Sequence, residues 1–588
     1  MLKSNHWRSP LRELKYRRNA LSPISSLHSE LFAAIFSILC LPGTSPQEEN
    51  PDDCYVSRLH ISHVCHQWRE ITLNLPLLWS YVNFTSKSLS SVGIAETLVR
   101  AKSAPLHFEA TFLGHRLDHD RSRTFRKELH THVPHIRHLQ ICAGPLLLHG
   151  ILEGLRVVSP ASTLKHLSLS SISTEGKRRR MEGHGRTSIP DTLFNNMTPK
   201  LSRLELDNCN ISWRSPLLKG LKILEIRNPS ATARPELAVW LAALDEMPQL
   251  TTLTLRSASP IAPPFPFVVS YTITLPSLKN LNIFTSPEDC ALALAHLDLP
   301  ALTSLCLTSS SSHSLSKSDV HKLLPFIGRH AYGPQDSQPL QRVLIRGDVY
   351  HTEILAWPVS NIGVEVHDLP TLLTEALPAR VALSLKGGEW SSPENRLEIL
   401  DMVTASLPLS GLVILAAHDL SSYEFEPAHD LSELEQGPET QHFWHHVSLM
   451  WPLLQCVRLG PGAARGFIKM MLEDNGGGKK PLLPSLTQLV VVDFSLRSLS
   501  LLPLRNALMK RVKEGVPVKV LDLRMCRPHT NDRAEDWLKS LREIVDDVLR
   551  PEFEEREQVN LMRNIIYYDP FSNNGYSSGS DDDEDDDE

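Results

Sequence analysis

The sequence predicts an α+β or α/β solenoid that follows a small N-terminal bundle of three helices. Three observations predict this architecture. The phrase LxxLxL recurs along most of the chain, stretches with helix-like apolar spacing lie between its copies, and helix-sized apolar patterns occupy residues 21–84. A chain of 588 residues, of which 41% are hydrophobic and 22% charged, has an ordinary globular composition and is long enough for one extended array.

These patterns divide the chain into four parts. Residues 1–20 form a charged N-terminal tail, residues 21–84 the helical bundle, residues 85–550 the solenoid, and residues 551–588 a C-terminal segment. The last eight residues are all acidic and carry much of the formal net charge of -7. Because such a composition buries too little apolar area to offset chain entropy, we expect a disordered acidic tail.

The first helix is predicted in the segment SSLHSELFAAIFSIL. Its apolar residues recur at steps of three or four, which places them on one stripe of a helix: Ile24, Leu27, Leu31, Ile35 and Ile38. A polar, acidic stretch from Pro42 to Tyr55 follows, and its composition is typical of a surface loop.

The second helical pattern lies in SRLHISHVCHQWREITLNL. Its apolar residues share one face: Ile61, Val64, Trp68 and Ile71. Pro76 forces the chain to restart, and a third, shorter element carries Leu78 and Trp79. Three helices within about 60 residues leave a large share of their area in water. We therefore expect the bundle to have a partner.

Residues 21–84 resemble an F-box of the kind found in fungal F-box proteins. Three blocks occur in the family's order: Leu27, Glu30, Leu31, Ile35 and Phe36, then Val64, Cys65, His66, Gln67, Trp68 and Arg69, then Pro76, Leu77, Leu78 and Trp79. His28 stands where the family usually has a proline, which weakens the helix-start signature. An alternative interpretation is a helical bundle that serves only as an N-terminal cap on the solenoid.

The resemblance implies that the bundle binds a Skp-type adaptor and, through it, a cullin. The residues that would make this contact are Leu27, Glu30, Leu31, Ile35, Phe36, Val64, Cys65, Trp68, Arg69, Pro76, Leu78 and Trp79.

The body of the chain is a run of LxxLxL units. Seven clear copies begin at residues 136, 164, 201, 221, 250, 278 and 302, and weaker ones begin at 340, 380, 454, 486 and 518. In this phrase the last two leucines alternate along a strand and point the same way, so each unit contributes one short strand to a shared core. The units resemble leucine-rich repeats, which implies a curved array with parallel strands on one face and helices on the other. The family pattern also implies a structural role for Cys209 and Cys526, in the turn after a strand.

Helices are expected between the strands. Helix-like spacing occurs in residues 235–249, 318–331 and 504–515. A helix over Ala95 to Lys102 and a strand over Leu106 to Phe112 are predicted to join the bundle to the first repeat.

The register is weakest between Gly387 and Trp451. One degenerate copy is expected at 409–420, and an exposed acidic loop is expected at 423–441.

Cysteine usage and charge limit the functional classes. Nine cysteines are scattered without a CxxC pair, which suits a reducing compartment better than a disulfide framework. No signal-like apolar run starts the chain, and no stretch of about 18 apolar residues is present. The modest net charge argues against a nucleic-acid-binding body. We expect an intracellular protein of the cytoplasm, the nucleus or both, with no membrane partner.

No catalytic, metal-binding or cofactor-binding residues are predicted. GYSSG at 575–579 spells a nucleophile motif but lacks the strand and helix that the motif requires. His442 and His446 have metal-ligand spacing, but the glutamate of a metal motif is missing between them, and a partly buried helix with surface histidines is the preferred interpretation. NGGGKK at 475–480 lacks phosphate-loop spacing, and KRRR at 177–180 is either a solvated loop or a nuclear import signal.

Two functions are consistent with the sequence. The first is a substrate-recognition adaptor of an SCF-type cullin-RING ubiquitin ligase, in which the bundle binds the Skp-type adaptor and the solenoid binds a protein substrate of unknown identity. The alternative is a non-catalytic interaction scaffold with no role in ubiquitination.

Overall fold

The structure of the chain is a computed structural model. The structure describes residues 14, 17–19, 21–40, 51–86, 89–112, 118–156, 160–172, 186–261, 271–309, 317–331, 339–347, 351–358, 379–386, 393–418, 438–473, 481–492, 498–526 and 538–549. The predicted acidic tail, GYSSG, NGGGKK and KRRR all lie outside these residues.

The fold is mixed α/β with mostly parallel strands. It divides into two compact units. The first unit ends at Leu302, apart from Ser286–Glu288, and the second contains those three residues and the chain from Thr303 onward.

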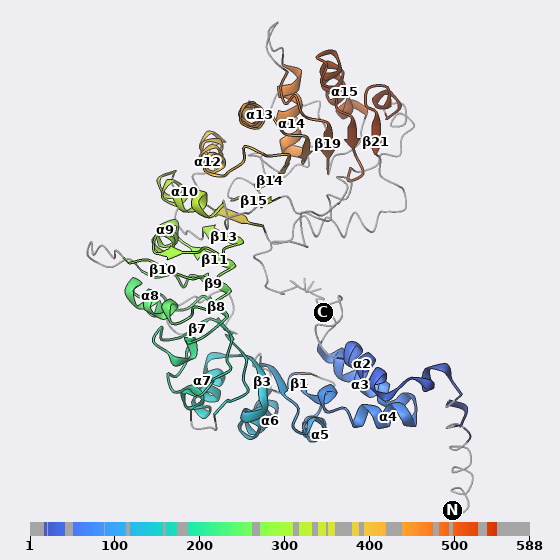
Figure 1. Cartoon of the computed structure of the whole chain (residues 1–588), viewed down its shortest axis with the longest axis vertical. Helices are drawn as coiled ribbons and strands as arrows, with labels where there is room; N and C mark the ends of the chain where they lie inside the picture. Colours follow the sequence, from blue (N-terminus) through green and yellow to red (C-terminus); the bar gives the residue numbers. More distant parts are fainter. Residues whose placement is uncertain are drawn as a thin grey trace, which may run out of the picture. The chain divides into compact units, whose positions relative to one another are not determined.

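Three helices begin the first unit (Figure 1). They are α2 (Ser29–Cys40), α3 (Pro51–Val64) and α4 (His66–Leu73), preceded by the 3-10 turn η1 (Pro23–Ser26) and followed by η2 (Pro76–Trp79). Helix α2 packs against α3, α4 and η2. Phe32 and Phe36 of α2 are fully buried, and their ring centres lie 5.6 and 5.1 Å from that of Trp68 on α4.

The structure corrects two expectations in this region. The second helical pattern is two helices, because Cys65 between them has extended backbone angles and its Sγ accepts the N–H of Trp68 as a helix cap. The loop predicted from Pro42 to Tyr55 is wrong at its end, since α3 already begins at Pro51. The first part of that loop lies outside the described residues.

A parallel sheet forms the rest of the first unit. Its strands adjoin one another in chain order: β1 (Tyr81–Asn83), β2 (Leu106–Phe112), β3 (Ile136–Ala143), β4 (His166–Ser171), β6 (Arg203–Asp207), β8 (Ile223–Arg227), β9 (Thr252–Arg256) and β11 (Asn280–Thr285). The seven clear copies of the repeat phrase each contain a strand, the last being β13 of the second unit, so the strand prediction is confirmed. Strand β1 falls within the range predicted for the helical bundle.

Helices and short segments connect these strands. Figure 1 shows helices along one side of the sheet. They are α5 (Ser91–Ala101), α6 (Asp118–His132), α7 (Pro145–Gly154), α8 (Leu237–Asp245) and α9 (Pro287–Ala295). The 3-10 turns are η3 (Val133–His135), η4 (Leu193–Asn196), η5 (Pro216–Leu218) and η6 (Ala231–Ala233), and two short parallel pairs join β5 (Thr187–Ser188) to β7 (Cys209–Asn210) and β10 (Ile273–Thr274) to β12 (Leu297–Asp298).

Alternation along the strands builds the core of this unit. In β4 the side chains alternate between partly exposed and buried positions. The buried leucines of six successive strands are in register, and none is more than 2% exposed: Leu139, Leu167, Leu204, Leu224, Leu253 and Leu281.

A left-handed residue ends three neighbouring strands. Asn208, Asn228 and Ser257 have φ of 52°, 52° and 53°. Each donates its backbone N–H to the carbonyl oxygen that ends the next strand, at 2.7 to 2.9 Å. The turn after the strand therefore needs a positive φ, which asparagine tolerates better than serine.

The strands of the second unit are also mostly parallel. Its strands are β13 (Ser304–Ser309), β14 (Leu340–Gly347), β15 (His351–Pro358), β16 (Val381–Lys386), β17 (Ile414–His418), β18 (Cys456–Leu459), β19 (Gln488–Val491), β20 (Val520–Asp522) and β21 (Asp547–Leu549). Its helices are α10 (Lys317–Ala331), α12 (Pro393–Ser406), α13 (Pro438–Met450), α14 (Pro461–Leu472) and α15 (Ser498–Lys513), and successive helices pack side by side.

Strand order in the second unit departs from chain order. β13 pairs with β16, β15 is antiparallel to both β14 and β16, and β14 then pairs with β17. From β17 to β21 the strands are parallel and in chain order. The degenerate copy expected at 409–420 is β17, whereas β15 was not predicted. Helix α13 begins at Pro438, so the end of the loop expected at 423–441 is helical, and its remainder lies outside the described residues.

Candidate protein-interaction surfaces

Helix α2 has apolar residues on two faces. Phe32 and Phe36 face inward and form the core with Trp68. Four other large side chains of this helix face water, with exposed fractions of 39% to 60%: Leu31, Ile35, Ile38 and Leu39. Their spacing of four, three and one residues places them on one stripe. This α2 stripe is an apolar surface that the described residues leave uncovered.

The residues predicted to contact a Skp-type adaptor fall into three groups. Those exposed are Glu30, Leu31, Ile35, Val64 and Arg69, and those partly exposed are Leu27, Cys65, Trp68 and Pro76. Phe36, Leu78 and Trp79 are completely buried inside the chain. In this structure these last three therefore support the exposed stripe from behind.

The helices are fastened to the first strand by buried groups that sequence analysis did not identify. Trp79 Nε1 donates to the Thr72 carbonyl at 2.8 Å, and the Arg100 guanidinium of α5 lies 4.7 Å from the Trp79 ring centre. Arg58 of α3 is 1% exposed and donates from Nη1 to the carbonyl of Tyr81 in β1 at 2.9 Å. An arginine within a helical pattern gives no signal of such burial, because its role depends on a strand that follows later in the chain.

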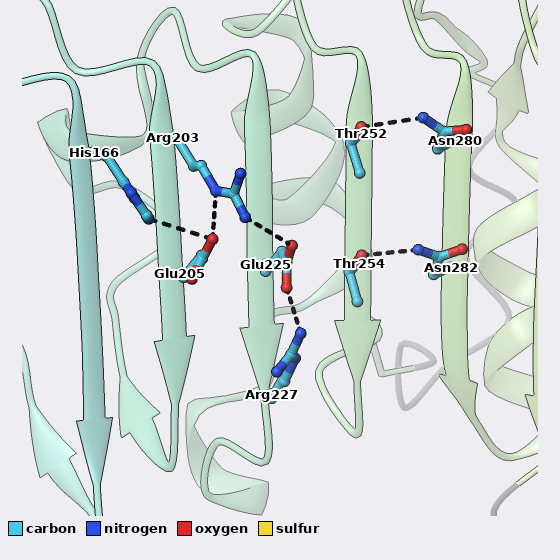
Figure 2. Close-up of polar contacts among 9 residues, drawn as sticks. All are labelled: His166, Arg203, Glu205, Glu225, Arg227, Thr252, Thr254, Asn280 and Asn282. Carbon is cyan, nitrogen blue, oxygen red and sulfur yellow. Dashed lines mark hydrogen bonds and ion pairs between the residues drawn. The ribbon is translucent and has the colours of Figure 1, made fainter. Parts of the chain in front are cut away.

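A second surface is the polar face of the sheet in the first unit (Figure 2). Residues facing away from the helices line up in rows across the strands. One row contains Tyr81, His107, His138, His166, Arg203, Ile223, Thr252 and Asn280. The next contains Asn83, Glu109, Gln140, Ser168, Glu205, Glu225, Thr254 and Asn282.

Ion pairs connect the two rows in the middle of this face. Glu205 lies 3.3 Å from His166 Nε2 and also pairs with Arg203, whose other nitrogen lies 4.0 Å from Glu225. Arg227 reaches Glu225 at 2.6 Å. Burial alone would raise the pKa of Glu205, but His166 and Arg203 lower it to about 2. The acidic groups in the middle of this face are thus already paired with cations.

Three histidine rings are in contact beside this network, with His107 stacked on His138 and His166 edge-on to His138. The ring centres of His107 and His138 are 5.0 Å apart, and those of His138 and His166 are 5.8 Å apart. Burial, followed by the charges of His138 and His166, lowers the pKa of His107 to about 4. For His138, burial comes first, followed by the charges of His166, Arg137, Lys165 and Arg203, and its pKa is also about 4. His107 and His138 are therefore neutral at pH 7.

Amide groups continue the polar face on its other side. Asn280 Nδ2 donates to Thr252 Oγ1 at 3.3 Å, and Asn282 Nδ2 donates to Thr254 Oγ1 at 3.1 Å, as Figure 2 shows. Within these two rows, the side chains of β9 and β11 are uncharged.

A row of residues lies at or just before the start of six strands of this sheet, at the second position of the repeat phrase. Backbone hydrogen bonds of 2.7 to 2.9 Å join its members in order: Arg137, Lys165, Ser202, Lys222, Thr251 and Lys279. Four of these six residues are basic, and all four are exposed. Sequence analysis missed this basic row, although its signal lies in the phrases IRHL, LKHL, LKIL and LKNL.

The two cysteines expected in repeat turns are buried. The Cys209 thiol donates to the Leu169 carbonyl at 3.7 Å, and the Cys526 thiol donates to the Val491 carbonyl at 3.2 Å. In both cases the acceptor lies in or beside the preceding strand of the stack. Burial raises the pKa of Cys209 to about 12. Both thiols are therefore structural groups that join one repeat to the one before it.

The structure describes the side chain of only one of the two histidines with metal-ligand spacing. His446 Nε2 lies 3.3 Å from Asp401, and the side chain of His442 lies outside the described residues. Across the part of the chain that the structure describes, no group of three or more His, Cys, Asp or Glu side chains is arranged to hold a metal ion. None of the helices within the described ranges combines the length and apolar content needed to cross a bilayer.

The chain matches no protein-family model, and comparison with curated proteins yields no significant match.

Proposed function

We propose that this protein is a substrate-recognition adaptor of an SCF-type cullin-RING ubiquitin ligase. Its N-terminal helices would bind a Skp-type adaptor and, through it, a cullin, while the repeat array would hold the protein substrate. In this role the chain acts by positioning. Holding a substrate lysine near the charged ubiquitin carrier raises their effective concentration, so the chain itself needs no catalytic group.

The observation that supports this proposal most strongly is the α2 stripe. It belongs to a segment whose three sequence blocks resemble an F-box. Its side chains are exposed, while Phe32 and Phe36 of the same helix are buried against Trp68. A helix that has already buried Phe32 and Phe36 does not need Leu31 and Ile35 for its own packing. Their exposure is best explained by a partner that covers them.

The test is co-purification of the Skp-type adaptor and cullin with the double variant Leu31→Asp/Ile35→Asp. Placing two carboxylates in an apolar interface is strongly unfavourable, so we expect adaptor binding to fall at least about a hundredfold. Because both positions are exposed in the structure, the variant should keep the native helices. Circular dichroism checks this directly.

The matched control is Val92→Asp/Val99→Asp on α5. These two valines are 80% and 72% exposed and lie on a different helix of the same unit. The control should bind the adaptor as the unmodified chain does. If the α2 variant also retains full binding, the α2 stripe is not the adaptor surface. If the chain binds the adaptor but no partner is ubiquitinated or turned over faster, the scaffold alternative is favoured.

A further inference from the structure

Three cations of the basic row are not neutralised by any carboxylate of the described residues. Within the described residues, no ion pair joins Arg137, Lys165 or Lys222 to a carboxylate, whereas the acidic side chains of the neighbouring rows are held by Arg203, Arg227 and His166. The row therefore has an excess of positive charge.

These cations lie beside the open polar face. Arg137 directly precedes His138, Lys165 donates its backbone N–H to the Arg137 carbonyl at 2.8 Å, and Arg203 is the register partner of His166. These residues thus lie in one local cluster, whose acidic member Glu205 is already paired to Arg203 and His166.

The spacing of the row suits an extended chain. Neighbouring strands lie about 4.8 Å apart, so Arg137 and Lys165 are one strand apart, and Lys222 and Lys279 follow at intervals of two strands, or about 10 Å. An extended peptide places alternate side chains about 7 Å apart. A segment with an acidic residue at every second or third position could therefore follow the row.

We propose that the basic row, together with Arg203, binds an acidic extended segment of a partner protein through its carboxylates. The proposal deepens the proposed function, on which it rests for the identification of that partner as the ligase substrate. Charge complementarity is the basis for this occupant, because Arg137, Lys165 and Lys222 are exposed and form no ion pair with a carboxylate among the described residues.

The direct test measures binding of a fluorescent peptide of about nine residues with alternating glutamate and threonine to the full-length chain by anisotropy. Binding should weaken as salt rises. The variant Arg137→Ala/Lys165→Ala should bind about tenfold to a hundredfold more weakly, because two charge-assisted contacts are lost. Lys127→Ala, at an exposed lysine of α6, should bind as before.

A charge swap gives the strongest evidence. The variant Arg137→Glu/Lys165→Glu should reject the glutamate peptide and bind its lysine counterpart instead. Because the last eight residues are acidic and could compete, the assay is repeated with a full-length chain in which they are replaced by asparagine and glutamine.

Three results would overturn the proposal. These are no peptide binding by either form of the chain, unchanged affinity in the Arg137→Ala/Lys165→Ala variant, and equal binding of an oligonucleotide of the same charge. The test is independent of the ligase role. The basic-row variants should still co-purify with the adaptor, and Leu31→Asp/Ile35→Asp should still bind the peptide, so failure of one proposal leaves the other measurable.

Discussion

Arg58 Nη1 lies 2.9 Å from the carbonyl oxygen of Tyr81, and its guanidinium carbon lies 5.7 Å from the centre of the same residue's ring. One buried side chain thus holds α3 against both the backbone and the ring of the first strand. The helical segment and the sheet of the first unit share this contact, so the N-terminal helices are part of that unit's packing.

Arg58→Met should loosen this junction. Methionine keeps the length of the apolar stem but cannot donate to the Tyr81 carbonyl, so we expect a local loss of about 1–3 kcal/mol. Hydrogen exchange measured by mass spectrometry should show faster exchange in α3 and β1. Arg69→Ala, at an exposed site on α4, should leave exchange in both elements unchanged. Equal protection of α3 and β1 in Arg58→Met would show that the contact contributes little.

Ser257→Gly should stabilise the first unit. Serine at a φ of 53° is strained, and glycine adopts this conformation without steric cost, so a gain of about 0.5–1 kcal/mol is expected. The comparison is Ser230→Gly, where φ is -65° and the same substitution should destabilise the chain. Urea unfolding followed by circular dichroism measures both. A shift of the same sign for the two variants would contradict the role assigned to the turn.

The thiols of Cys209 and Cys526 should resist labelling. Both are buried and donate to backbone carbonyls, and burial raises the pKa of Cys209 to about 12, so little thiolate forms at pH 8. Mass spectrometry after timed exposure to iodoacetamide should find them modified far more slowly than the partly exposed Cys65. Labelling of all three at one rate would count against the buried turn positions.

Acidification should destabilise the first unit before Glu205 titrates. The pKa of His107 is about 4 in the folded chain and about 6.5 when unfolded, so the unfolded chain binds this proton more readily. The stability that neutral His107 contributes is complete above pH 6.5 and is lost as the pH falls toward 4. At pH 5 the stability lost is roughly 2 kcal/mol. Glu205, whose pKa is about 2, loses its contribution only below about pH 4.5.

The variant His107→Gln isolates this effect. Its free energy of unfolding should change less between pH 7 and pH 5 than that of the unmodified chain. His149→Gln, at an exposed histidine of α7, is the control and should keep the original dependence. If His107→Gln keeps it too, another group is responsible for the sensitivity to acid.

Sequence reasoning located most strands because their signal is local. The leucines of each LxxLxL phrase indicate which residues face the core. Leu204 and Leu224 occupy the same position of their phrases, and this predicts that they pair in register. It did not find β15, whose apolar residues 354–357 lie outside any such phrase, and it could not indicate that this strand would run antiparallel.

The α2 stripe was identified from the sequence only in part. The spacing of Leu31, Ile35 and Ile38 correctly predicted one stripe, whereas Ile24 and Leu27, predicted on the same stripe, precede the helix, which begins at Ser29. Phe32 and Phe36 form a second stripe on this helix. Periodicity cannot rank two apolar stripes, because the choice between core and surface depends on where α4 brings Trp68. The basic row was missed for a different reason. Its members are far apart in the sequence, and they become neighbours only when the repeats are aligned with one another.

The antiparallel excursion through β15 also affects the order in which the second unit can assemble. In the first unit each strand can add to the one made just before it as the chain leaves the ribosome, as Leu224 does beside Leu204. Strand β13 has no such neighbour in β14, because its partner is β16, where Leu305 meets Val381. Stepwise growth of this sheet must pause at β13 until the chain beyond residue 386 has been synthesised. A nascent chain halted before that point would leave β13 without β16, and this interval is where chaperones would be needed most.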